Sequence, residues 1–87
     1  MKGQLIKNYI NKLSISDVNN MAIKNNINLS NDELNYIYNQ IKNNYHNLLY
    51  GDSSIIFNDL KNNVSSSNYE KIKNLFDTYK QKYQSLL

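Results

Sequence analysis

Apolar residues recur along the chain at steps of three and four positions, which is the period of an α-helix and not the alternation of a β-strand. Two glycines and no proline leave few positions that would interrupt a helix. Serine and aspartate occur between the apolar stretches, at the points where helices would begin. The pattern therefore predicts an all-α protein.

The first two predicted helices are short. One spans about residues 2–13, and the next begins at Ser16, whose hydroxyl would cap it, with Asp17 at the positive end of the helix dipole. An Asn-rich turn over residues 25–29 follows, because Asn tolerates the left-handed conformation that ends a helix. The expected inward-facing residues are Leu5, Ile6, Tyr9, Ile10 and Leu13 in the first helix and Val18, Met21 and Ala22 in the second.

The third predicted helix starts at the clearest signal in the chain. Ser30 and Glu33 have the spacing of a capping box, in which each side chain accepts a hydrogen bond from the other residue's backbone N–H. The helix is expected to run to about Leu49, to end at Gly51 and to carry an Asn-rich polar side. Its apolar stripe comprises Leu34, Ile37, Tyr38, Ile41, Tyr45, Leu48 and Leu49.

Two more helices are predicted in the rest of the chain. A short one follows Asp52, Ser53 and Ser54, and a longer one runs from a second capping box, Ser67 and Glu70, to the C-terminus. Their inward-facing residues are expected to be Ile56, Phe57, Leu60 and Val64, then Tyr69, Ile72, Leu75, Phe76, Tyr79, Tyr83 and Leu86. Each helix has one apolar side, so the chain is predicted to form a single domain over residues 1–87, a compact bundle of four to five short amphipathic helices.

Composition excludes several function classes. The chain has no cysteine, which removes disulfides, thiolate zinc sites and cysteine nucleophiles. No apolar run approaches the roughly 20 residues of a membrane span, and none follows the basic N-terminus as in a signal peptide. We therefore expect no membrane partner and a cytoplasmic location, which suits a chain without cysteine. The many Asn, Lys and Ile residues have A/T-rich codons and indicate a low-GC genome.

The side chains offer little for catalysis or metal binding. His46 is the single histidine, and no carboxylate lies within a helical turn of it, so we interpret it as an exposed or partly packed residue. One histidine and the lack of a Gly-x-Ser-x-Gly elbow argue against Ser-His-Asp catalysis. Asp59 is interpreted as a solvated acid, and no acidic pair resembles an acid/base couple. We expect no catalytic, metal-binding or cofactor-binding residues, and hence no enzyme.

Tyrosine is the frequent aromatic residue, with eight copies. Tyr36 lies opposite the apolar stripe of the third predicted helix, and Tyr50 also projects away from that stripe. Exposed tyrosines are enriched at binding hot spots. The leading hypothesis is a non-enzymatic helical protein-interaction module, an adaptor or small inhibitor that docks on a larger protein through Tyr36 and Tyr50. Self-association is also open, because a small core gains by burying more apolar surface.

Weak nucleic-acid binding is the alternative hypothesis. The net charge is +3, and lysines near Tyr79 and Tyr83 of the last predicted helix could contact a nucleic acid. However, Glu70 and Asp77 alternate with lysines on one side of that helix, which indicates a solvated ladder of ion pairs, and the chain has no arginine. The lysines concerned are Lys71, Lys73, Lys80 and Lys82.

The second and third predicted helices also suggest a helix-turn-helix motif for DNA. Ala22 would be its small residue, and Asn26 would replace the usual turn glycine. The expected apolar position after the turn falls on Asp32, and Asp32 and Glu33 would face the phosphates. Because adjacent acids repel a polyanion, this interpretation is less favoured.

Three stretches of the chain carry a family resemblance. They are Ile10-Asn11-Lys12-Leu13 with Ser16-Asp17, residues 28–34 with Ile37, Ile41-Lys42 and Leu48-Leu49-Tyr50, and residues 79–83. In these stretches the chain resembles the YqfT-like family, short uncharacterised proteins of low-GC Gram-positive bacteria. The resemblance covers most of the chain and implies a small helical cytoplasmic protein without an assigned activity.

Overall fold

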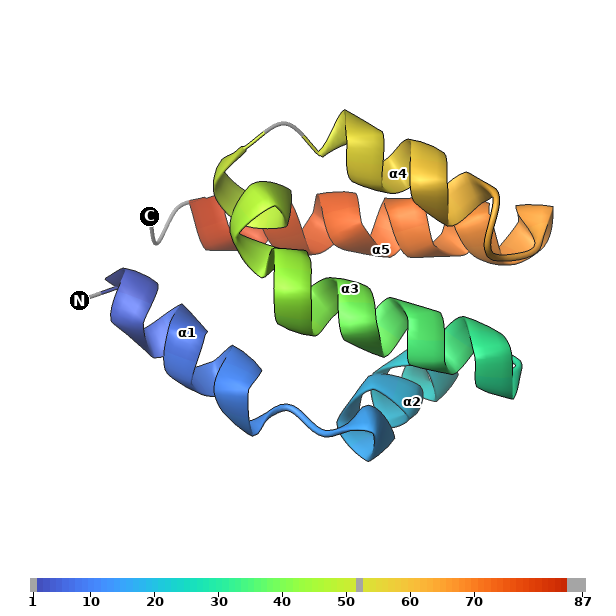
Figure 1. The fold of residues 1–87 in the computed structure, drawn as a ribbon, viewed down its shortest axis with the longest axis horizontal. Coiled ribbons are helices and arrows are strands. Elements are labelled where there is room, and N and C mark those ends of the chain that lie inside the picture. The colour runs from blue at the N-terminus through green and yellow to red at the C-terminus, as the bar shows by residue number, and fades with distance from the viewer. Residues whose placement is uncertain (1, 52, 85–87) are drawn as a thin grey trace.

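The computed structural model describes residues 2–51 and 53–84, with side chains described for residues 7–48, 51 and 53–82. Within them the chain forms five helices and no strand, which confirms the predicted all-α bundle (Figure 1). The Cα radius of gyration, 12.5 Å, is close to the roughly 12 Å typical of a compact domain of this length. The helices are α1 (Lys2–Lys12), α2 (Ile15–Lys24), α3 (Asn31–Tyr50), α4 (Ser54–Lys61) and α5 (Ser66–Gln84).

The helices pack in two groups. In the N-terminal group, α3 packs against both α1 and α2. In the C-terminal hairpin, α4 packs against α5. Figure 1 shows α3 crossing the middle of the molecule, with α1 and α2 on one side and the antiparallel hairpin on the other. Any site between the groups is therefore built from residues far apart in the sequence.

The start of α2 differs from the prediction. Ser14 is the N-cap, because its Oγ accepts the N–H of Asp17 at 3.1 Å and its own N–H donates to Asp17 Oδ2 at 3.0 Å. A cap at Ser16 would put Asp17 at the next position, where its carboxylate could not return this bond. The capping box places Leu13 and Val18 at the positions of a hydrophobic staple, and both are buried.

The predicted signals at both ends of α3 are confirmed. Ser30 Oγ accepts the N–H of Glu33 at 3.1 Å, and Glu33 Oε1 accepts the N–H of Ser30 at 3.0 Å. The helix extends to Tyr50, and the N–H of the C-cap Gly51 donates to the carbonyl of Asn47. In the turn before α3, Asn26 takes the left-handed conformation with φ 61°, as expected of an Asn there.

The start of α5 also differs from the prediction. The helix begins at Ser66, and the hydroxyl of Ser65 accepts the N–H of Asn68 at 3.2 Å. The predicted capping box of Ser67 and Glu70 is wrong, because Ser67 lies inside the first turn. The helix before it, α4, begins at Ser54 as expected, although Ser53 makes no side-chain capping bond. Asp52 lies outside the described residues.

Few side chains are fully buried. Tyr9 is predicted to face inward, but its side chain is 56% exposed. The next residue of α1, Ile10, is buried instead. Most apolar residues of α3, α4 and α5 are half-buried rather than buried. The side chains of Leu5, Ile6, Leu49, Tyr83 and Leu86 lie outside the described residues. Among the described side chains, the buried apolar residues are Ile10, Leu13, Val18, Ala22, Ile27 and Leu60.

Candidate binding cavity

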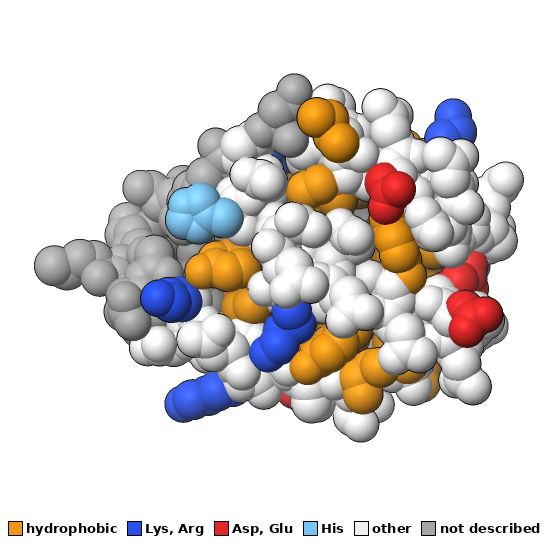
Figure 2. All heavy atoms as spheres, viewed as in Figure 1, with side chains coloured by type: hydrophobic (Ala, Val, Ile, Leu, Met, Phe, Trp, Pro, Cys, Tyr) orange, Lys and Arg blue, Asp and Glu red, His pale blue; other side chains and the backbone are white. Residues whose placement is uncertain are grey.

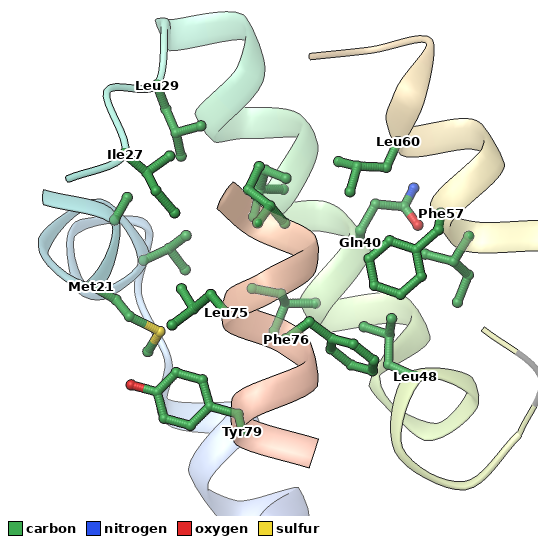
Figure 3. Close-up of a pocket in the computed structure, with 16 residues that line it drawn as sticks. Met21, Ile27, Leu29, Gln40, Leu48, Phe57, Leu60, Leu75, Phe76 and Tyr79 are labelled. Atoms are coloured by element: carbon green, nitrogen blue, oxygen red, sulfur yellow. The ribbon is translucent and has the colours of Figure 1, made fainter. Parts of the chain in front are cut away.

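An apolar cavity of about 190 Å³ lies between the N-terminal group and the C-terminal hairpin, and it is partly open to solvent (Figure 3). Its lining comes from α2, the loop before α3, and α3, α4 and α5. The lining residues are Val18, Met21, Ala22, Ile27, Leu29, Ile37, Gln40, Ile41, Leu48, Ile56, Phe57, Leu60, Ile72, Leu75, Phe76 and Tyr79. The cavity explains why the apolar stripes of α3, α4 and α5 are only half-buried.

The cavity lining is almost entirely carbon and contains no charged side chain. Gln40 and Tyr79 are its polar residues. The Oε1 atom of Gln40 accepts a hydrogen bond from Asn44 Nδ2 at 2.9 Å. A guest in the cavity would therefore gain dispersion contacts and apolar burial, but little hydrogen bonding.

Two phenylalanine rings pack against each other on the hairpin side of the cavity. The rings of Phe57 from α4 and Phe76 from α5 meet edge to face, with centroids 5.0 Å apart and planes at 64°. This geometry is favourable for aromatic pairs. The pair fixes two ring surfaces in the lining before any guest enters.

The cavity is partly open, so its apolar walls are not all covered by other protein atoms. Apolar side chains that face such a space make fewer dispersion contacts than fully packed ones. A guest seated there would add contacts of this kind.

A polar cluster joins the same two helix groups next to the cavity. We call it the Glu33 junction, and it consists of Asn28, Ser30, Glu33, Ser65 and Asn68. Glu33 Oε2 accepts the N–H of Ser65 at 2.8 Å, and Glu33 Oε1 accepts the side-chain amide of Asn68 at 3.2 Å. That amide also donates to the carbonyl of Asn28 at 2.8 Å. Asn68 is 7% exposed, so the cluster satisfies a buried polar side chain.

The Glu33 carboxylate is stabilised in its charged form. Burial raises its pKa, but hydrogen bonds from the N–H groups of Ser30 and Ser65, from Asn68 and from the Ser30 side chain outweigh burial. The pKa of Glu33 therefore lies below its ordinary value. The carboxylate is ionised at neutral pH and holds the junction together.

Two lysines stabilise the ends of other helices. Lys42 Nζ donates to the carbonyls of Ile10 and Asn11 at 2.8 and 3.0 Å, at the end of α1. Lys71 Nζ donates to the carbonyl of Asn26 at 3.0 Å, just beyond α2. Cations suit these positions, because helix C-termini carry partial negative charge. Sequence periodicity gave no signal for these contacts, which join distant segments.

The structure engages two of the four lysines proposed for nucleic acid. Lys71 donates to the carbonyl of Asn26, and Lys80 is half-buried with its Nζ 5.8 Å from the centroid of the Phe76 ring. Lys71, Lys73 and Lys82 are exposed on α5. A nucleic acid would therefore compete with existing contacts of Lys71 and Lys80.

The predicted tyrosine surface changes in the structure. Tyr36 is half-buried, and its hydroxyl donates a hydrogen bond to Asp59 Oδ2 on α4. Burial and then the Asp59 carboxylate raise the pKa of Tyr36. The prediction of a solvent-facing Tyr36 is wrong, because the hairpin approaches this side of α3. Asp59 is exposed as expected, yet it is tied to Tyr36. The side chain of Tyr50 lies outside the described residues.

Metal-binding clusters and membrane-spanning helices are absent from the described residues. In that part of the chain no group of three His, Cys, Asp or Glu residues is placed to hold a metal ion. None of the helices described there has the length and apolarity needed to span a bilayer. His46 is exposed on α3, with its ring edge-on to Tyr45 at 5.8 Å. Figure 2 shows it at one end of a face where hydrophobic side chains form small areas separated by polar atoms.

Comparison with models of protein families, with curated proteins and with solved structures gave no match to this chain. The resemblance to the YqfT-like family therefore stays a prediction. The functional argument rests on the geometry of the cavity and its surroundings.

Proposed function

We propose that this chain is a non-enzymatic helical binding module that takes up an apolar group of another molecule in the central cavity. The observation that carries the proposal is an almost wholly apolar void of about 190 Å³ in a domain of only 87 residues. The proposal keeps the binding role inferred from the sequence. It moves the contact from Tyr36 and Tyr50 to the cavity.

The position of the cavity supports a binding role. Ile41 of α3 and Leu75 of α5 line it from different helix groups, so a guest would contact both groups at once. Burying apolar surface on both sides would stabilise the closed bundle by mass action. Binding in the cavity would therefore increase the unfolding free energy of the whole domain.

Among the lining residues, the Tyr79 phenol is the group that could take part in acid–base or covalent chemistry. The lining includes no acid, lysine, histidine, serine or threonine, so a nucleophile–base pair cannot be assembled from it. The nucleic-acid alternative has less support, because Lys71 and Lys80 are occupied by intramolecular contacts. A binding module is the function that the arrangement favours.

The proposal is tested by native mass spectrometry of the chain purified from cells without detergent. The test variant is Leu75→Phe, which places a larger side chain in the cavity. The control is Ile55→Phe, the same kind of change at a residue of α4 that is 75% exposed and does not line the cavity. We expect a bound molecule on the wild type and on Ile55→Phe, and its loss from Leu75→Phe. An unliganded wild type, or equal retention by both variants, would contradict the proposal.

A further inference from the structure

We infer that the guest is a small uncharged molecule whose apolar body is about the size of one substituted aromatic ring. The inference rests on the proposed function, because it names the class of molecule that the cavity takes. It follows from the volume of the cavity and from the chemistry of its lining.

The volume sets the size of the guest. The cavity measures about 190 Å³. An engineered apolar cavity of about 150 Å³ in another protein, lined by Leu, Ile and Phe, stays dry and binds benzene. A slightly larger space suits a ring with one small substituent. A molecule with several fused rings or a long acyl chain would exceed it.

The lining sets the charge of the guest. No charged side chain lines the cavity, and the Gln40 carbonyl oxygen already accepts a bond from Asn44. A carboxylate or ammonium inside would lose its hydration without gaining a partner. An extended polypeptide segment would meet the same obstacle, because each backbone N–H and C=O needs a partner when buried. The part of the guest that enters the cavity is therefore uncharged and makes few hydrogen bonds.

The surroundings favour an aromatic guest. The edge-to-face pair of Phe57 and Phe76 presents ring surfaces in the lining, and Met21 adds a polarizable thioether (Figure 3). Aromatic rings gain from both kinds of contact. Aliphatic side chains such as Ile41 of α3 and Leu75 of α5 form other parts of the lining.

Toluene and benzoate test the inference on the full-length chain. They share one ring but differ in charge. We expect toluene to raise the melting temperature with saturation and to shift methyl NMR signals of residues that line the cavity, while benzoate at equal concentration does neither. Leu75→Phe should weaken toluene binding at least about tenfold, which is a change in affinity that titration resolves readily. Ile55→Phe should bind toluene as the wild type does.

A second variant keeps the test decisive. If Leu75→Phe does not fold, Ile41→Phe fills the cavity from α3 instead. Equal binding of toluene and benzoate would overturn the inference. So would toluene effects that rise linearly, without saturation, in the wild type and the variants alike.

The two proposals fail in distinguishable ways. If the wild type carries a partner protein or a second copy of the chain that Leu75→Phe releases, and toluene does not bind, the binding module stands and the small-molecule inference fails. If toluene binds the wild type saturably but the chain from cells carries no guest, the chemistry of the cavity stands and the proposed function fails.

Discussion

The Glu33 junction and the central cavity connect the same two helix groups through opposite kinds of surface. In the junction, a carboxylate and the amide of Asn68 meet specific donors and acceptors at 2.8–3.2 Å. In the cavity, apolar side chains of both groups line a partly open space of about 190 Å³. Hydrogen bonds are directional and fix the positions of their partners, whereas apolar contact has no preferred direction.

The difference indicates how a small bundle keeps a cavity. Directional contacts at the junction hold the hairpin against the N-terminal group, so α3 and α5 need not pack tightly to preserve the fold. Tyr36 and Asp59 make a further tie between α3 and α4. Under the proposed function, the apolar centre takes up the guest while these polar contacts hold the helices in place. Three predictions test this division, from the largest effect to the smallest.

Removing the Glu33 side chain should have the largest effect on stability. Glu33→Ala removes the acceptor of the Ser30 N–H in the capping box and the acceptors of the Ser65 N–H and of the Asn68 side-chain amide. We expect a loss of about 1–3 kcal/mol in unfolding free energy, since each such hydrogen bond contributes about 0.5–1.5 kcal/mol. Urea denaturation measures this loss. The neighbouring exposed acid provides the control, because Asp32→Ala should cost less than about 1 kcal/mol. Equal losses of unfolding free energy in both variants would contradict a stabilising role for the Glu33 junction.

Acidification should weaken the junction before it affects the cavity. The folded chain holds the pKa of Glu33 below the ordinary 4.5, so its contribution is complete above that value and is lost as the pH falls through the lower folded pKa. The unfolded chain binds more protons in this window, and stability should therefore decrease as the pH drops below about 5. Glu33→Gln should make the decrease shallower. The Asp17 carboxyl, whose pKa is lowered by hydrogen bonds from Ser14, would leave a residual slope. Identical slopes for wild type and Glu33→Gln would argue against this role.

Filling the cavity should cause the smallest change in unfolding free energy, and this change should be an increase. Leu75→Phe adds apolar volume to the void, and we expect a gain of about 0.5–2 kcal/mol in unfolding free energy, as cavity-filling changes commonly give. Ile55→Phe at an exposed position should change stability by less than about 0.5 kcal/mol. Thermal and urea denaturation of the guest-free proteins provide the comparison. A loss of about 1–3 kcal/mol in Leu75→Phe would mean that the site is already packed.

The local structure of this protein was largely readable from its sequence. Five amphipathic stretches became five helices, the Ser30–Glu33 box formed as predicted, and Gly51 ended α3. These features depend on residues three or four positions apart, whose interactions a helical period determines. The prediction failed where neighbouring serines could each cap a helix. Ser14 caps α2 in place of Ser16, because the Asp17 carboxylate can accept the Ser14 N–H in return. Ser65 caps α5 in place of Ser67, and the N–H of Ser65 donates to Glu33, 32 residues away in the sequence.

The cavity, the Glu33 junction and the engagement of Tyr36 were decided by the tertiary structure. A helical wheel shows which side of a helix is apolar, but it does not show which helix meets that side or how closely. Helical periodicity places Tyr36 on the polar side of α3. In the structure it is half-buried, because α4 packs near this side and Asp59 of α4 accepts its hydroxyl hydrogen. The sequence by itself determined five helices and their apolar sides, through interactions within a turn. The distances between those sides, and hence the apolar cavity, came from the packing of whole helices.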